Sequence, residues 1–201
     1  MVLLGLVIAG HSVGHADFQN GDFELPLTGT WVQTGTQMGL VAGGDADADV
    51  EARLYWSYQT VAPPYSGSTV NSSIEQTTTV ADLATDLTFK RRADITNSAG
   101  GAGQGSVDAV VEAQLLDAGN LVLTTRQWNS ATAWETVTVN LQQWADAEGL
   151  PAGSVAAVRF SAQVSGVAPV KPDWYVGTTL FVDDVHLTPV ASGVADWALF
   201  Q

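Results

Sequence analysis

The chain of 201 residues contains no cysteine and very little positive charge. Without cysteine there is no disulfide, so the fold must depend on packing or on a bound metal. Seven basic residues stand against 21 acidic ones, and the formal net charge is −14. Nucleic-acid binding needs clustered Lys and Arg, and the one such cluster, Lys90-Arg91-Arg92, is better explained as the solvated face of a strand. We therefore expect no nucleic-acid partner.

The acidic residues are mostly aspartate, 15 against six glutamates, and lysine is represented only by Lys90 and Lys171. This balance resembles that of proteins from hypersaline surroundings, where salt screens the mutual repulsion of surface charges. A soluble acidic extracellular protein has a similar composition. Both origins stay open on composition alone.

Recognisable catalytic motifs are also missing. No nucleophile elbow is present, and the glycine run at 100–105 is not followed by the Lys-Ser or Lys-Thr of a phosphate loop. Asp45, Asp47 and Asp49 alternate with alanine but lack the glycine and closing glutamate of a calcium loop, so they predict a solvated acidic loop. A glycosidase pair of carboxylates is the one catalytic arrangement left open. We expect the protein not to be an enzyme.

Long hydrophobic runs are absent apart from a short one near the N-terminus, from Val2 to Gly10. This run is too short to cross a bilayer, and no basic residue precedes it as in a secretion signal. We expect residues 1–16 to form an apolar arm that is covered by its own sheet or by a neighbouring subunit. The tail, residues 190–201, is also apolar and predicts a second contact with other protein subunits.

Alternating apolar and polar residues dominate the rest of the chain and predict β-strands. The ranges with this pattern are 73–80, 87–91, 107–116, 121–125, 134–141, 155–164 and 178–187. Between 134 and 141 the alternation places Trp134 on the polar face, opposite Val137 and Val139. Only 141–148 has a helical signal, ended by Gly149 and Pro151. Many short strands with turns between them predict an all-β sandwich in one domain, residues 17–189.

The order of several motifs resembles that of carbohydrate-binding modules with a galactose-binding-like fold, in particular those that bind xylan and cellulose. The first motif is Asn20-Gly21-Asp22-Phe23-Glu24 followed by Trp31, and the last is Phe181-Val182-Asp183-Asp184-Val185. Between them, 73–77, 87–89, 110–117 and 134–139 are similar to the family's inner strands. The resemblance covers about residues 18–188 and implies a jelly-roll β-sandwich. It also implies that Trp31 and Trp134 pack inside.

The same resemblance implies a structural Ca²⁺ where the first and last strands meet. Asn20, Glu24 and Asp183 match the positions that hold the ion. Calcium takes about six to eight oxygen ligands, so it would join carboxylates from both ends of the chain. The alternative is that Glu24 and Asp183 are solvated or hydrogen-bond a loop.

Modules of this kind hold sugars by stacking aromatic rings on them, and the chain has seven Trp and four Tyr. The candidates for ligand binding are Tyr55, Trp56, Tyr58, Trp128, Trp174 and Tyr175. The alternative is that these rings fill the core, as large aromatics do in β-sandwiches.

Two functions follow from these features, and both are non-catalytic. The first is a structural or adhesion module of a surface assembly, such as the head decoration, turret or tail of a virion, and the apolar ends indicate it. The second is a secreted or cell-surface carbohydrate-binding module that targets polysaccharide, and the motif series and the aromatic candidates indicate it. We expect a location on a virion surface, on a cell surface or outside the cell.

Overall fold

The computed structural model describes residues 17–35, 38–42, 49–60, 69–80, 82–97, 106–129, 133–167 and 174–190. The predicted arm at 1–16 and the tail from 191 onward lie outside these residues. Within them the chain forms ten strands and one helix, in the order β1 (Val32–Thr34), β2 (Met38–Ala42), β3 (Val50–Thr60), β4 (Thr69–Thr79), β5 (Thr85–Asn97), β6 (Ser106–Leu116), β7 (Val122–Asn129), β8 (Glu135–Asn140), α1 (Leu141–Ala147), β9 (Ala157–Val167) and β10 (Trp174–Pro189).

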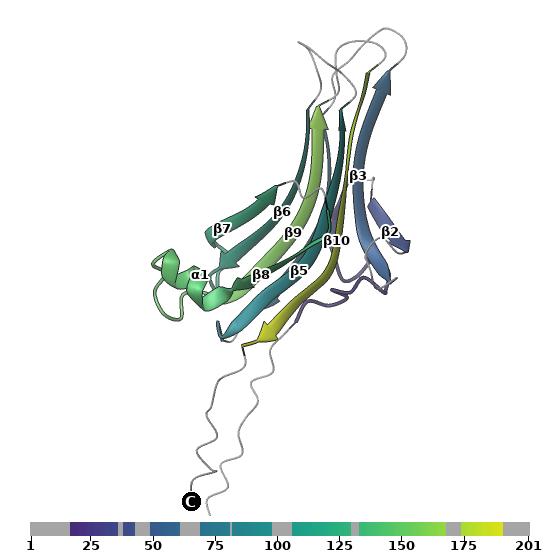
Figure 1. Cartoon of the computed structure of the whole chain (residues 1–201). Coiled ribbons are helices and arrows are strands. Elements are labelled where there is room, and N and C mark those ends of the chain that lie inside the picture. Colours follow the sequence, from purple (N-terminus) through teal and green to yellow (C-terminus); the bar gives the residue numbers. More distant parts are fainter. Residues whose placement is uncertain are drawn as a thin grey trace, which may run out of the picture.

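The strands form two five-stranded sheets that lie face to face. The first sheet has the order β1-β4-β9-β6-β7 and the second the order β2-β3-β10-β5-β8, and neighbouring strands are antiparallel throughout. The long strands bend along their length, and α1 lies beside β8 (Figure 1). The all-β jelly-roll sandwich predicted from the sequence is thereby confirmed.

The period-two alternation of the strands builds the core between the sheets. On β6, Ala109, Val111, Ala113 and Leu115 are fully buried, as the sequence pattern predicts, and Asp108, Glu112 and Gln114 on the other face are more exposed. Phe160 of β9 is at the centre, with its ring edge-on to the rings of Phe18, Trp31 and Phe89. Burial of this apolar surface is the main stabilising term of the fold.

The segment from Asp17 to Trp31 fastens the beginning of the described chain to its last strand. The Asp17 carboxylate accepts the backbone N–H of Leu187 at 2.7 Å, and the Gly21 carbonyl accepts the N–H of Val185 at 2.9 Å. Phe23 and Trp31 are buried, and their ring centres lie 5.2 Å apart with the rings tilted to each other. The expected packing of Trp31 in the core is therefore present, and β10 lies at the centre of its sheet.

The predicted strands are all present, and the helix predicted at 141–148 is α1. Its N-cap is Asn140, whose side-chain oxygen accepts the N–H of Gln143 at 2.9 Å. The sequence analysis did not predict β1, β2 or β3. Two of these are short strands at sheet edges, and β3 was considered only as a group of aromatic residues.

Candidate functional site

The outer face of the second sheet carries a row of aromatic and basic side chains across its strands. The register places Arg53 of β3 opposite Phe181 of β10, and Phe181 opposite Arg92 of β5. Trp134, the residue before β8, ends the row, with its ring centre 6.2 Å from that of Phe181. The guanidinium of Arg92 lies 4.4 Å from the centre of the Phe181 ring and 5.9 Å from that of Trp134. We call these four residues the aromatic–arginine row.

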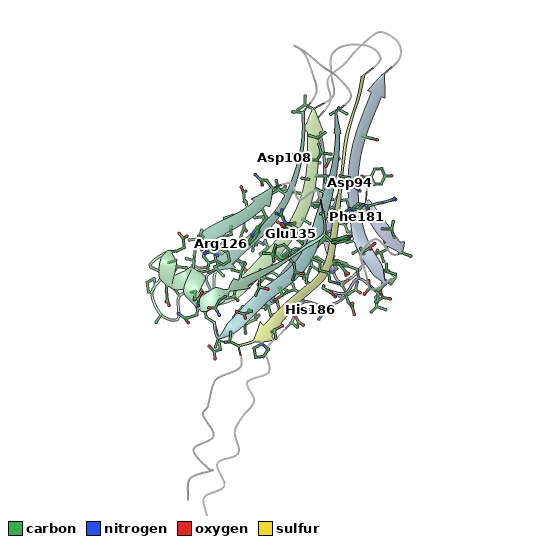
Figure 2. The ribbon with its side chains drawn as sticks, viewed as in Figure 1. Asp94, Asp108, Arg126, Glu135, Phe181 and His186 are labelled. Atoms are coloured by element: carbon green, nitrogen blue, oxygen red, sulfur yellow. The ribbon has the colours of Figure 1, made fainter. Side chains whose placement is uncertain are left out.

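A second row lies beside the first. Tyr55 of β3 is opposite Thr179 of β10, which is opposite Asp94 of β5. The Arg53 guanidinium lies 5.1 Å from the centre of the Tyr55 ring, which belongs to a residue that is 37% exposed. Arg53, Tyr55, Thr179 and Phe181 together line an open pocket of about 220 Å³. Figure 2 shows Phe181 and Asp94 on neighbouring strands of this face.

The strand pleat is the reason that these side chains point to solvent. On β10, Leu180 and Val182 are buried in the core, so Thr179 and Phe181 take the opposite face. The same alternation holds on β3, where Leu54 is fully buried. Aromatic rings at outward positions of a sheet therefore gather on one surface without contributing to the core.

The chemistry of this surface suits a flat ligand with an apolar face and a polar rim. The pocket offers the rings of Tyr55 and Phe181 for stacking, and guanidinium and hydroxyl groups of Arg53 and Thr179 for hydrogen bonds. Binding sites for small molecules commonly combine apolar walls with a few placed polar groups in this way. A pyranose ring has both features, because its C–H face is apolar and its hydroxyl groups form the rim.

Of the six residues predicted to bind a ligand, Tyr55 is part of this site. Trp128 packs at the edge of the core, with its ring edge-on to Phe89 at 5.2 Å. The side chains of Trp56, Tyr58, Trp174 and Tyr175 lie outside the part that the structure describes, although their backbones belong to β3 and β10.

The four residues of the aromatic–arginine row were not among the predicted ligand residues, and neither was Thr179 of the pocket. Phe181 was interpreted only as part of the closing strand, and Arg53 and Arg92 were not considered as ligand-binding residues. Trp134, which was expected to pack inside, instead lies on the outer face against Phe181. The signal that could have found them is the alternation itself, since it places Trp134 on the polar face of its strand.

Asp183 of β10 marks a second, acidic position on the same strand. Its Oδ1 accepts the N–H of Asp184 at 2.8 Å, while its buried Oδ2 has no hydrogen-bond partner among the described residues. Burial raises the pKa of Asp183 to about 7, and repulsion by the carboxylates of Asp184 and Asp49 acts in the same direction. The backbone hydrogen bond from Asp184 and the positive charge of Lys90 lower the pKa again, but by less.

The other two predicted calcium ligands are differently placed. The Glu24 carboxylate accepts the N–H of Val50 at 2.9 Å, which brings it to the residue after Asp49. The Asn20 side chain is engaged at both ends by the backbone of Leu25, at 2.8 Å each, and holds a local turn. Among the described residues no three His, Cys, Asp or Glu side chains are arranged as a ready metal site.

These observations decide which residues fit a calcium ion. The unpartnered Oδ2 of Asp183 fits, because a buried carboxylate needs a cation or a proton to balance it. Asp49, which the sequence analysis assigned to a solvated loop, acts electrostatically on Asp183 and joins the candidate set. The Asn20 side-chain oxygen accepts one backbone N–H and has a second lone pair, so its place among the calcium ligands stays a prediction.

Comparison with known proteins gives matches in structure only. No protein-family profile and no curated protein matches the sequence. Among solved structures, the chain is similar to TmCBM61, solved in complex with β-1,4-galactotriose, at 12% identity and a TM-score of 0.48, covering 85% of this chain and 96% of that one. It is also similar to a CBM4 structure, at 15% identity and a TM-score of 0.46, with coverages of 86% and 99%. A third is the family 11 carbohydrate-binding module from Clostridium thermocellum, at 11% identity and a TM-score of 0.38, with coverages of 87% and 96%.

The all-β sandwich expected from the sequence motifs is the architecture that the structure itself shows, in two facing five-stranded sheets. At these sequence identities and TM-scores, the similarity to these structures does not establish a function for this chain. In addition, none of the helices in the described part of the chain has the length and apolar character of a membrane span.

Proposed function

We propose that the protein is a non-catalytic carbohydrate-binding module that works outside the cell or at a surface. The observation that carries the proposal is the open pocket beside the aromatic–arginine row, where Tyr55 and Phe181 present their rings next to hydrogen-bond donors. The structures with a similar fold are carbohydrate-binding modules, which supports the same function. The role of the protein would be to hold a glycan, not to change it.

The test is to remove one ring at a time. We expect Tyr55→Ala and Phe181→Ala each to weaken oligosaccharide binding about tenfold or more, because truncating an aromatic at the centre of a binding surface removes one of its largest contributions. Binding is measured by isothermal titration calorimetry, after a panel of neutral and acidic oligosaccharides has been screened by tryptophan fluorescence. Both residues point away from the core, so the melting temperature should change little.

The matched control is Leu121→Ala, which removes an apolar side chain of 66% exposure outside the pocket. It should leave the affinity unchanged. Wild-type protein that binds no member of the panel, or ring variants that bind as well as the control, would contradict the proposal.

We also propose that Ca²⁺ binds between Asp183 and Asp49, with Glu24 beside them, and holds the first turn against the last strand. Calcium supplies positive charge to oxygen ligands and would balance the buried carboxylate of Asp183. We expect calcium to raise the melting temperature of the wild type above its value in chelator, and Asp183→Ala to abolish that increase. Glu148→Gln, an exposed change beside α1, is the control and should keep it. Equal melting temperatures of the wild type in calcium and in chelator would refute the site.

Membership of a surface assembly, such as a virion head decoration, turret or tail, stays a prediction. It depends on the apolar segments at 1–16 and 190–201, of which the structure describes only Val190. It is compatible with glycan binding, because a surface component that holds a glycan serves adhesion.

A further inference from the structure

The chain uses two of its five arginines on the binding face. Arg53 and Arg92 stand on either side of Phe181 in one row across three strands. Neighbouring strands are spaced by about 4.8 Å, so the two backbone positions are about 10 Å apart. In a chain with a net charge of −14, this pairing concentrates positive charge where the rings are exposed.

Arg53 has unused capacity for hydrogen bonding. Its Nε is buried and has no hydrogen-bond partner, and the residue forms no ion pair within the described part of the chain. Its guanidinium instead stacks on Tyr55 at 5.1 Å and lines the pocket. A buried donor without a partner is costly and rare, and the guanidinium that carries it lines the pocket, where an acceptor can bond its other N–H groups.

Arg92 repeats the arrangement on the other side of Phe181. Its Nε is also buried without a hydrogen-bond partner, and its guanidinium stacks on Phe181 at 4.4 Å. One terminal nitrogen pairs with Asp94 at 2.6 Å, but Asp94 is half exposed, and exposed ion pairs of this kind contribute little. An anionic ligand group can therefore compete with Asp94 at moderate cost.

From this arrangement we infer that the ligand is an acidic glycan, one whose sugar rings carry carboxylate or sulfate groups. A guanidinium that stacks on an aromatic ring keeps its N–H groups in its own plane, pointing away from the stack. Two such N–H groups match the two oxygens of a carboxylate, and charge-assisted bonds of this kind are stronger than neutral ones. The sugar ring would lie on Tyr55 and Phe181 while its anionic group meets Arg53 or Arg92.

The inference rests on the proposed function and deepens it. A neutral glycan would contact the rings and would offer the two guanidinium groups only uncharged hydroxyl oxygens. The overall negative charge of the protein opposes long-range attraction of a polyanion, so recognition here depends on direct contact with the two arginines.

The experiment compares pairs of polymers that differ only in charge. The probes are polygalacturonate and its methyl ester, glucuronoxylan and its carboxyl-reduced form, and a sulfated galactan and its desulfated form. We expect at least one acidic polymer to bind about tenfold or more tightly than its neutral partner, as a hydrogen bond to a charged group contributes that much. The carboxylate and sulfate pairs distinguish the two sources of the anionic group.

Arginine variants then assign the preference to the site. Arg53→Gln and Arg92→Gln should reduce the ratio of acidic to neutral affinity toward one, because each removes a charge-assisted bond that only the acidic polymer can form. Arg159→Gln is the matched control, since Arg159 lies on the other sheet and bonds Thr77 and Gln114. Asp94→Asn should increase the affinity for the acidic polymer, because it removes the competing carboxylate.

The outcomes distinguish a failure of the acidic-glycan inference from a failure of the proposed carbohydrate-binding function. Equal binding of acidic and neutral partners that depends on Tyr55 overturns the inference and leaves the proposed function standing. A preference for the acidic polymer that survives Arg53→Gln and Arg92→Gln also overturns it. Absence of binding to every polymer overturns both.

Discussion

At the scale of single residues, Asp183 is a side chain that makes the stability of the protein depend on pH. Its carboxyl is buried on the central strand of the second sheet, and burial raises its pKa from 3.8 to about 7. The folded protein therefore holds a proton more tightly than the unfolded chain between these two values. Since stability changes with pH according to that difference in bound protons, it must fall as the pH rises through this window.

The first prediction at this scale is that the protein loses stability as the pH rises, and that Asp183→Asn removes this loss. In chelator, the free energy of unfolding of the wild type should fall relative to the variant between about pH 4 and pH 7, by at most about 1.4 kcal/mol per pH unit. Urea unfolding at several pH values measures both proteins. Parallel pH curves for the wild type and the variant would show that Asp183 has an ordinary pKa in the folded state.

The aromatic residues show what could be predicted at this scale and what could not. Trp31 is in the core as the resemblance implied, and Tyr55 is at the pocket as proposed from its type. The positions of Trp134 and Trp128 differ from those predicted. The sequence shows that a ring is present but not which residues surround it. Alternation within the strand placed Trp134 correctly, whereas the family resemblance did not.

At the scale of elements, the turn at Gly21 is a close backbone contact between the beginning and the end of the sandwich. A Cβ at this position would collide with the carbonyl oxygen of Val185, and Val185 is held close to the turn because its N–H donates to the Gly21 carbonyl. Asn20 and Phe23 on either side have positive φ angles, so the whole turn is specialised for this approach.

We therefore expect Gly21→Ala to destabilise the protein by about 2 kcal/mol or more, since a backbone clash forces the strand and the turn apart. The control is Gly39→Ala on β2, where an added Cβ has no neighbour within 4 Å. Urea unfolding of both variants gives the comparison. Similar stabilities of the two variants would mean that the turn yields easily.

The strands and the helix differ in how well their sequences predict them. β6 and β9 are long and buried on one face, so their alternation is strong, and α1 has Asn140 as N-cap and Gly149 after its end. β1 and β2 are three and five residues long and lie at sheet edges, where few side chains are buried. A short edge strand forms because it hydrogen-bonds to a neighbouring strand. The residues that decide its structure therefore lie elsewhere in the chain, and its own sequence does not predict it.

At the scale of the whole molecule, the dominant property is the charge of −14 carried by one small sandwich. Like charges on a compact body repel one another, and salt screens the repulsion. We expect the melting temperature to rise by several degrees between about 0.1 M and 1 M NaCl, over which the Debye length shortens from about 10 Å to about 3 Å. Differential scanning calorimetry measures it.

The control for the salt effect is the same experiment near the pI of about 4.1, where the net charge vanishes. The increase should largely disappear there. An equal increase at both pH values would mean that salt acts through hydration of the surface and not through the charge.

The fold as a whole was predictable because the order of its motifs is spread along the entire chain. The pairing of strands far apart in the sequence was not predictable. The proposed binding face depends on this pairing, since Arg53, Phe181 and Arg92 meet only through their register. Pairing over such distances is set by the complete core, so no local pattern contains it.

The contact of Asp17 with Leu187 has one further consequence. A polypeptide that enters the sandwich at Asp17 leaves it three residues beyond Leu187, at Val190, so both attachment points share one end of the body (Figure 1). Domains of this geometry can be spliced into a loop of a host protein without stretching it. If the sandwich were inserted into a longer chain, it would project from the surface of the host protein. The face with Phe181 would then lie along the side of the projecting domain.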